Sequence, residues 1–149
     1  MNAWITLNGV ETLPLRMERH VENAHKVAGF LTQHHSVEWV SYAGLSSSPY
    51  YQLAQKYLQG KAGSVFTFGI RGGYESGLRL LEKVELFSHV SNIGDSRSLI
   101  LHPASTTHRQ LNDEQRLIAG AGPEVIRLSV GIESAEDLIA DLEQALEGL

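Results

Sequence analysis

Cysteine is absent from the 149 residues, which excludes disulfide frameworks, thiolate metal sites and cysteine nucleophiles. No apolar run approaches the ~18 residues that a membrane-spanning helix needs. The amino-terminal MNAWITLNGVETL has neither a basic stretch before an apolar one nor a small-residue cleavage site, so it is not typical of a signal peptide. These absences predict a cytoplasmic protein.

Basic residues are also few. Lysine and arginine number 12 against 17 acids, and the formal net charge of -5 is spread along the chain. This balance argues against nucleic acid or an anionic membrane as the main partner. The hydrophobic fraction of 42% and the charged fraction of 19% are typical of a globular protein, and the length suffices for one domain with a core.

Apolar periodicity predicts helices and strands in alternation. A helix is predicted over residues 2–34, interrupted or kinked near Pro14. Its buried stripe is predicted to consist of Met17, Val21, Ala24, Ala28 and Leu31. Further helices are predicted over 50–58, 74–84 and 112–119 and from 134 onward, and strands over 37–42, 64–70, 85–90, 98–101 and 124–130.

This order of elements predicts an α/β fold, in the form of an α+β-like sandwich. We expect a mixed sheet of about four to five strands with helices packed on it, behind a long amino-terminal helix. The chain is predicted to form a single domain over residues 1–149. Residues 1–35 would be a connector helix, and residues 36–149 the α/β body.

Arg127 stands out because it interrupts an apolar strand. Since side chains alternate along a strand, it must point away from Ile126 and Leu128. A guanidinium presents paired donors that match a carboxylate, which favours recognition of an amino acid. The alternative is an arginine on a solvated sheet face, or one paired with an acid on a helix.

The turn after the strand at 85–90 is a second candidate. Ser91 and Asn92 leave that strand, and Gly94 permits a tight backbone path with exposed amide donors. Such a turn suits the second oxygen of a carboxylate, although a plain surface turn has the same composition.

Histidines and glycines invite interpretations that the spacing does not support. His102 and His108 flank a hydroxyl-rich segment without a third ligand at a metal-like spacing, so hydroxyls satisfying backbone groups are favoured. The segment 69–77, GIRGGYESG, lacks the phosphate-loop lysine and is interpreted as a turn. The histidines of the first helix do not share one face and are interpreted as surface or partly packed residues: His20, His25, His34 and His35.

Four motifs in order carry a family resemblance. They are ETLPLRMERHVENA (11–24), FTFGIRGGYESG (66–77), SNIGDSRSLILHPASTTHRQL (91–111) and VIRLSVGIESAEDLIADLEQAL (125–146). Together they resemble the carboxy-terminal region of the pyridoxal phosphate (PLP)-dependent enzymes of Cys/Met metabolism. The SNIGDSRSLI loop is one residue longer than the form in the lyases of the family, which favours the O-acetylhomoserine sulfhydrylase branch.

The resemblance implies the small carboxy-terminal domain of a fold-type I PLP-dependent transferase, usually a homo-oligomer. The full-length enzyme of this branch makes homocysteine and acetate from O-acetylhomoserine and sulfide by γ-replacement, a step of methionine biosynthesis. By position, Arg127 would bind the substrate α-carboxylate, assisted by Ser91 and Asn92, with Thr107 in a supporting role.

The same resemblance implies that the cofactor-binding lysine of the family is absent from these residues. The cofactor-binding lysine of the family belongs to a preceding large domain, and no lysine here has the expected serine- or threonine-flanked context: Lys26, Lys56, Lys61 and Lys83. We therefore expect PLP in the full-length enzyme but none bound to this chain alone. No catalytic residue and no metal site are predicted in the chain, and its isolated form is predicted to be inactive.

Three classes of function stay open at this stage. The favoured one is the substrate-clamping domain described above, whose partners would be an amino-acid substrate and the missing PLP domain. The others are a stand-alone amino-acid-binding module and a structural or oligomerisation fragment. Self-association through the first helix is expected for the isolated chain. Both acetyl- and succinyl-homoserine stay open as donors, and so does the acceptor thiol.

Overall fold

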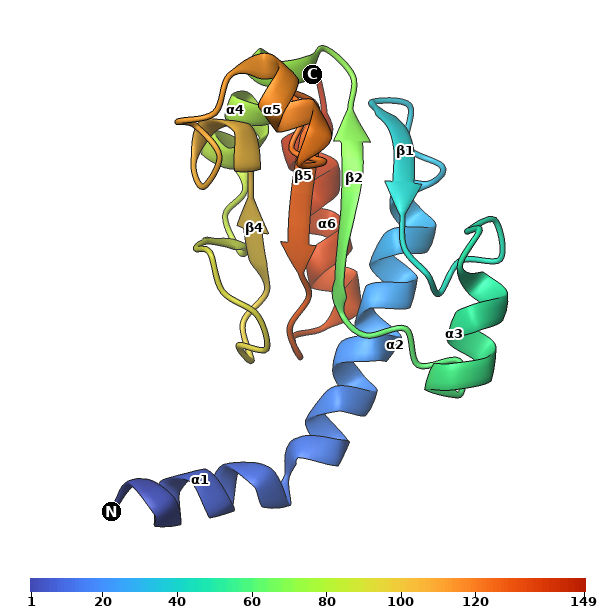
Figure 1. Cartoon of the computed structure of the whole chain (residues 1–149), viewed down its shortest axis with the longest axis vertical. Helices are drawn as coiled ribbons and strands as arrows, with labels where there is room; N and C mark the ends of the chain where they lie inside the picture. Colours follow the sequence, from blue (N-terminus) through green and yellow to red (C-terminus); the bar gives the residue numbers. More distant parts are fainter.

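A five-stranded mixed sheet organises the protein, which the computed structural model describes over residues 1–149 (Figure 1). The strand order is β1-β2-β5-β4-β3, with β3 parallel to β4 and the other pairs antiparallel. The strands are β1 (Val37–Ser41), β2 (Val65–Ile70), β3 (Ser88–His89), β4 (Leu99–Leu101) and β5 (Val125–Ser129). The predicted α/β class with a mixed sheet is confirmed.

The helices fall close to their predicted positions. They are α1 (Asn2–Glu11), α2 (Leu13–Leu31), α3 (Tyr51–Leu58), α4 (Gly73–Lys83), α5 (Asp113–Ile118) and α6 (Ala135–Leu146), with a 3-10 turn η1 at Pro103–Ser105. Asn112 and Gln115 form the predicted capping box of α5. None of these helices combines the length and the apolar character that a membrane span requires.

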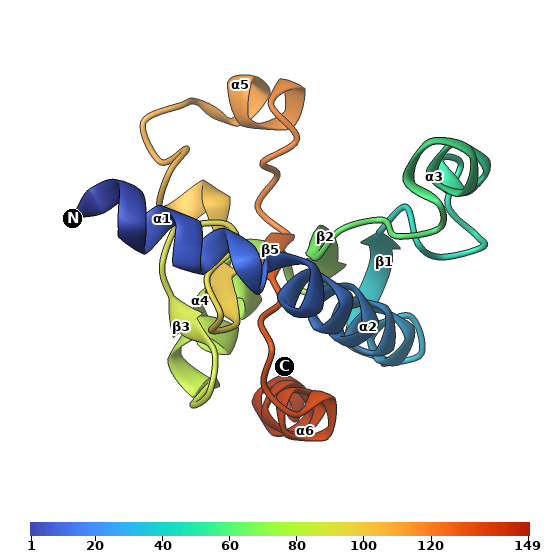
Figure 2. The same ribbon diagram turned by 90° about the horizontal axis from the view of Figure 1, so that it is seen from below.

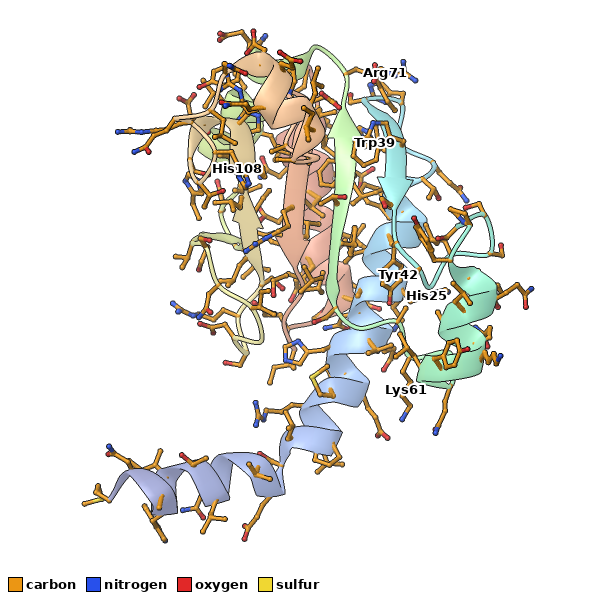
Figure 3. All side chains as sticks on the ribbon, viewed as in Figure 1. His25, Trp39, Tyr42, Lys61, Arg71 and His108 are labelled. Carbon is orange, nitrogen blue, oxygen red and sulfur yellow. The ribbon has the colours of Figure 1, made fainter.

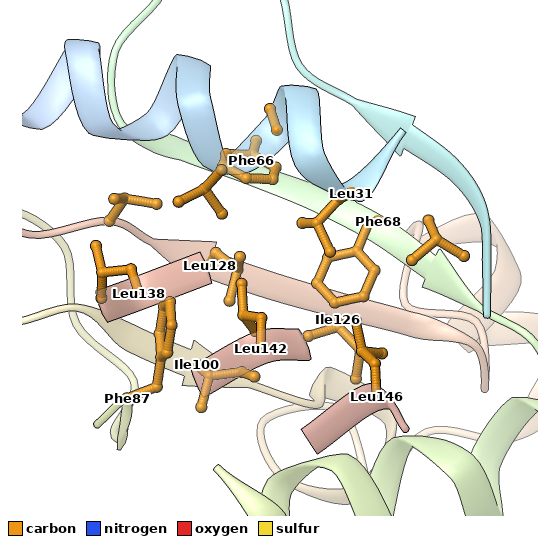
Figure 4. Packing of buried hydrophobic residues seen from close by; sticks show 14 of the residues in the cluster. Leu31, Phe66, Phe68, Phe87, Ile100, Ile126, Leu128, Leu138, Leu142 and Leu146 are labelled. Atoms are coloured by element: carbon orange, nitrogen blue, oxygen red, sulfur yellow. The ribbon is translucent and has the colours of Figure 1, made fainter. Parts of the chain in front are cut away.

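One face of the sheet carries the apolar core. Phe66, Phe68 and Ile70 of β2 are buried on this face, as the alternation predicts, and Ile126 and Leu128 of β5 lie beside them. Helices α2 and α6 cover these side chains (Figures 2 and 4). The core therefore lies between the sheet and this helical layer, and neither α2 nor α6 covers the opposite face of the sheet.

The break in the leading helix falls at Thr12. Pro14 cannot donate the backbone hydrogen bond that would continue α1, but it is accommodated in the first turn of α2. Helix α1 extends away from the sheet (Figure 1) and has no buried residue. Its Trp4 is 66% exposed and its Leu7 64% exposed. The predicted interruption near Pro14 is confirmed.

The buried stripe of α2 differs in part from the prediction. Ala24, Ala28 and Leu31 are buried as expected, but Met17 and Val21 are only half-buried. Val27, His20 and Asn23 take part instead. The interpretation of His20 as a surface or partly packed residue is wrong, because the connection between β5 and α6 passes over it: its Nδ1 lies 2.6 Å from the carbonyl oxygen of Val130.

The strand predicted over 85–90 is reduced to Ser88–His89. Asp141 of α6 explains the difference, because its carboxylate accepts hydrogen bonds from the backbone N–H groups of Glu85, Leu86 and Phe87 at 2.8, 2.9 and 3.2 Å. These donors are directed to the helix and not to a neighbouring strand, so sheet pairing begins only at Ser88.

Candidate functional site

Arg127 lies at the centre of β5, on the face opposite the helical layer. Its partners across the sheet are Thr67 of β2 and Leu101 of β4. Directly opposed residues of antiparallel strands share a face, so the arginine side chain emerges between these two. It is half-buried, and its Nη2 donates a hydrogen bond to the backbone oxygen of Asn92 at 3.0 Å.

The guanidinium has no acidic partner. None of the five ion pairs of the protein includes Arg127. Because an arginine carries five N–H donors and this one uses one on a backbone carbonyl, most of its hydrogen-bonding capacity is free for a ligand. The structure thus does not support the alternative of pairing with a helix acid.

Ser91 and Thr107 line an open cavity of about 450 Å³ beside this arginine. The remaining lining residues are His89, Leu101, Ser105, Thr106 and Arg109, and no acid is among them. Arg127 adjoins the cavity through Leu101, its strand partner, and through Asn92, which follows Ser91. The four predicted site residues are therefore neighbours, but only Arg127 and Asn92 are joined by a hydrogen bond.

Two ionisable residues of the cavity lining, His89 and Arg109, were not predicted as site residues. Arg109 places a guanidinium in the lining itself, whereas Arg127 lies beside the cavity, and His89 contributes an imidazole from the edge strand β3. Only its position directly after the Thr106–His108 segment could have indicated Arg109 as a site residue. An exposed arginine after a turn has no distinctive sequence pattern.

The hydroxyls around His102 have the structural role expected of them. Thr106 Oγ1 donates to the carbonyl oxygen of His102 at 2.7 Å, which confirms the prediction that this segment satisfies backbone groups. The His102 ring is buried, with Nε2 2.9 Å from the carbonyl oxygen of Pro123, and burial lowers its pKa. A Cβ on Gly77 would come within 3.0 Å of this ring, so the glycine allows close packing of α4. Nowhere in the structure do three histidine or acidic side chains gather as metal ligands would.

The lysines lie elsewhere on the surface. Lys26 pairs with Glu22 at 2.9 Å, Lys61 with Glu18 at 3.4 Å, and Lys83 donates to the carbonyl oxygen of Glu147 at 2.6 Å. Lys56 lies over the ring of Tyr57. Lys61 and His108, the neighbour of Thr107, are at opposite edges of the sheet (Figure 3). The residues present fit a carboxylate at Arg127, but they do not form a lysine site for PLP.

The whole chain has the fold of one part of a PLP-dependent enzyme. A Campylobacter jejuni crystal structure described as an O-acetylhomoserine (thiol)-lyase superposes with a TM-score of 0.92 at 47% identity, over 99% of this chain and 35% of that one. That structure contains N'-pyridoxyl-lysine-5'-monophosphate. More specifically, the family model described as Cys/Met metabolism PLP-dependent enzyme matches residues 1–147, and the chain belongs to this family. The predicted resemblance is confirmed.

Relatives with established names point to one branch. O-acetyl-L-homoserine sulfhydrylase 1 of Thermus thermophilus is 52% identical over 97% of this chain, and O-acetyl-L-homoserine sulfhydrylase of Leptospira meyeri is 51% identical over 99%. In both cases the match covers 34% of the relative, so the chain spans about a third of the length of the curated relatives. PLP is the cofactor of the family to which these enzymes belong.

Proposed function

We propose that this chain is the substrate-clamping domain of a cytoplasmic, oligomeric PLP-dependent O-acetylhomoserine sulfhydrylase. The whole enzyme would make homocysteine and acetate from O-acetylhomoserine and sulfide by γ-replacement. The observation that carries the proposal is Arg127, which is half-buried, free of any acidic partner and joined to the Asn92 carbonyl. The identity of about half to named sulfhydrylases supports the choice of reaction.

Arg127 would hold the substrate α-carboxylate through two parallel N–H donors. The hydrogen bond to the Asn92 oxygen fixes the guanidinium plane, and the Ser91 and Thr107 hydroxyls would complete the polar wall. A substrate held at its carboxylate has a fixed orientation, which is how positioning lowers a reaction barrier. PLP, held by the remainder of the enzyme, would supply the electron sink.

Residues 1–35 would connect this domain to the cofactor-binding domain, and residues 36–149 would form the clamp. The exposed apolar residues of α1, among them Trp4 and Leu7, suit contact with that domain or with another subunit. Because no lysine lines the cavity beside Arg127, the isolated chain should not turn over substrate.

A chimera tests the function. This chain replaces the segment that it matches in the Thermus sulfhydrylase, and homocysteine formation from O-acetylhomoserine and sulfide is measured. We expect activity, and we expect Arg127→Lys to lower kcat/KM for O-acetylhomoserine on the order of 100-fold, since lysine cannot make the bidentate contact.

Arg71→Lys is the matched control, because Arg71 is bound to the His35 carbonyl oxygen away from the cavity. An Arg127→Lys chimera with the parent kcat/KM would contradict the proposal. Borohydride reduction of the isolated chain with PLP should give only substoichiometric pyridoxyl-lysine spread over the surface lysines, as measured by mass spectrometry. A stoichiometric adduct would show that the chain carries its own cofactor site.

A further inference from the structure

The loop from Ser91 to Ser98 brings Asn92 to Arg127, yet this end of the loop is weakly held. Apart from the bond to Arg127, the contacts at this end are local, such as Ile93 N–H donating to Asn92 Oδ1 at 2.8 Å. Asp95 and Arg97 likewise bind each other, at 3.1 Å. The position of the loop must therefore be set mainly at its other end.

That other end is fixed by Glu133, in the connection between β5 and α6. The Glu133 Oε1 accepts from the backbone N–H of Ser98 at 2.6 Å, and its Oε2 accepts from the Ser98 hydroxyl at 2.9 Å. The Ser98 hydroxyl oxygen in turn accepts from the Gly131 N–H at 2.8 Å. One carboxylate thus binds two donors of a single residue, which fixes both the position and the rotation of Ser98.

Close packing adds to this restraint. Ile132 N–H donates to the carbonyl oxygen of Ser96 at 2.9 Å. A Cβ on Gly131 would collide with that Ser96 oxygen and with Glu133 Oε2, so only glycine lets the two segments approach this closely.

The connection that carries Glu133 is itself anchored to the core layer. Asn23 of α2 is buried, and its Nδ2 donates to the carbonyl oxygens of Gly131 and Glu133 at 3.1 and 2.8 Å. His20 holds the preceding carbonyl at Val130. A continuous set of contacts therefore runs from α2 through Glu133 and Ser98 to the loop that meets Arg127.

We propose that Glu133 is a positioning residue for the substrate-carboxylate site. It contacts no substrate, and it acts by holding Ser98 so that the Ser91–Asn92 segment stays against Arg127. This inference rests on the proposed function and adds to it a residue outside the cavity lining.

The test uses the active chimera and compares the two substrates. Glu133→Ala should raise KM for O-acetylhomoserine about tenfold, the scale of one lost charge-assisted hydrogen bond, while KM for sulfide stays at the parent value. Glu133→Gln should restore KM for O-acetylhomoserine, because the amide oxygen still accepts from Ser98 N–H. Amide hydrogen exchange over residues 92–98 should be faster in Glu133→Ala and near the parent rate in Glu133→Gln.

A double variant separates positioning from general weakening of the fold. In the Arg127→Lys background, Glu133→Ala should raise KM little further, because the contact that it positions is already lost. Asp113→Asn is the matched carboxylate control: Asp113 pairs with Arg116 on α5, away from the cavity, and its variant should keep both KM values. Ser98→Ala is the milder replacement if Glu133→Ala does not fold.

The outcomes distinguish the two proposals. An inactive chimera, or an Arg127→Lys variant with the parent kcat/KM, overturns the proposed function. If Arg127→Lys lowers kcat/KM, three results overturn only the role of Glu133. They are an unchanged KM for O-acetylhomoserine in Glu133→Ala, an equal rise of both KM values, and a full additional effect of Glu133→Ala in the double variant.

Discussion

The two sides of the sheet are held together in different ways. On the helical side, Phe68, Leu128 and Leu142 are fully buried in a single apolar cluster. On the side of Arg127, the loop 91–98 is tied to the body by individual hydrogen bonds, chiefly at Asn92 and at Ser98. The first side depends on the area removed from water, and the second on a few directional contacts.

This difference separates stability from ligand placement. Burial is not directional, so a core side chain contributes much free energy but does not orient a ligand. A hydrogen bond contributes less free energy, but it fixes the distance and direction of the groups that it joins. We therefore expect substitutions in the core to affect mainly unfolding, and those in the loop contacts to affect mainly the site.

The largest expected effect is that of Phe68→Ala. Removing a fully buried ring from β2 should lower the free energy of unfolding by about 3–5 kcal/mol, measured by urea denaturation of the 149-residue chain. Thr67→Ala, one residue away on the opposite face, should cost less than about 1 kcal/mol. Equal losses in the free energy of unfolding at the two positions would show that the two sides of the sheet do not differ in this way.

The helical side could be predicted well from the sequence. The alternation of Phe66, Phe68 and Ile70 follows directly from the period of a strand, and Leu138 and Leu142 follow from that of a helix. His20 and Asn23 could not be predicted in this way, because they are buried only where the β5–α6 connection supplies backbone partners. Periodicity contains no information about such partners, which come from 108 or more residues away.

For the side of the sheet that carries Arg127 and the loop 91–98, the sequence indicated only which kinds of residue take part. The apolar context of Arg127 and the polar composition of Ser91 to Thr107 indicated an anion site, and the structure brings these residues together. Glu133 was not singled out, because a glutamate before a helix cap has no distinctive pattern and its partner Ser98 lies 35 residues earlier. The strand predicted over 85–90 is shorter in the structure for the same reason, since its shortening to β3 depends on Asp141 of the distant helix α6.

A second substitution tests how much the loop contacts contribute to stability. Ser98→Ala removes the hydroxyl that joins Glu133 to the Gly131 N–H and leaves that N–H without its partner. We expect a loss of about 1–3 kcal/mol in the free energy of unfolding, smaller than the effect of Phe68→Ala. The urea midpoints of both variants, measured under one set of conditions, check the order. A reversed order would mean that the loop side contributes more to stability than the core.

The smallest effect concerns His102, the polar residue at the point where β4 meets α4. Burial lowers its pKa and outweighs the hydrogen bond to the Pro123 carbonyl oxygen, which by itself raises the pKa, so the folded state favours the neutral ring. The unfolded state therefore binds more protons below the ordinary imidazole pKa of 6.5. The contribution of His102 to stability should be fully present above that pH and should be lost as the pH falls toward its lower folded pKa.

Urea unfolding of the chain at a series of pH values from neutral to mildly acidic measures this loss. His102→Gln should flatten part of the decline, because a glutamine amide can donate to the Pro123 oxygen without titrating. His34, whose pKa burial also lowers, should account for a further part, which His34→Gln isolates. If the parent and His102→Gln curves ran parallel at all pH values, the buried ring would make no contribution to the pH dependence. A constant difference between the two curves would then reflect the packing of the side chain alone, as for the apolar residues of the core.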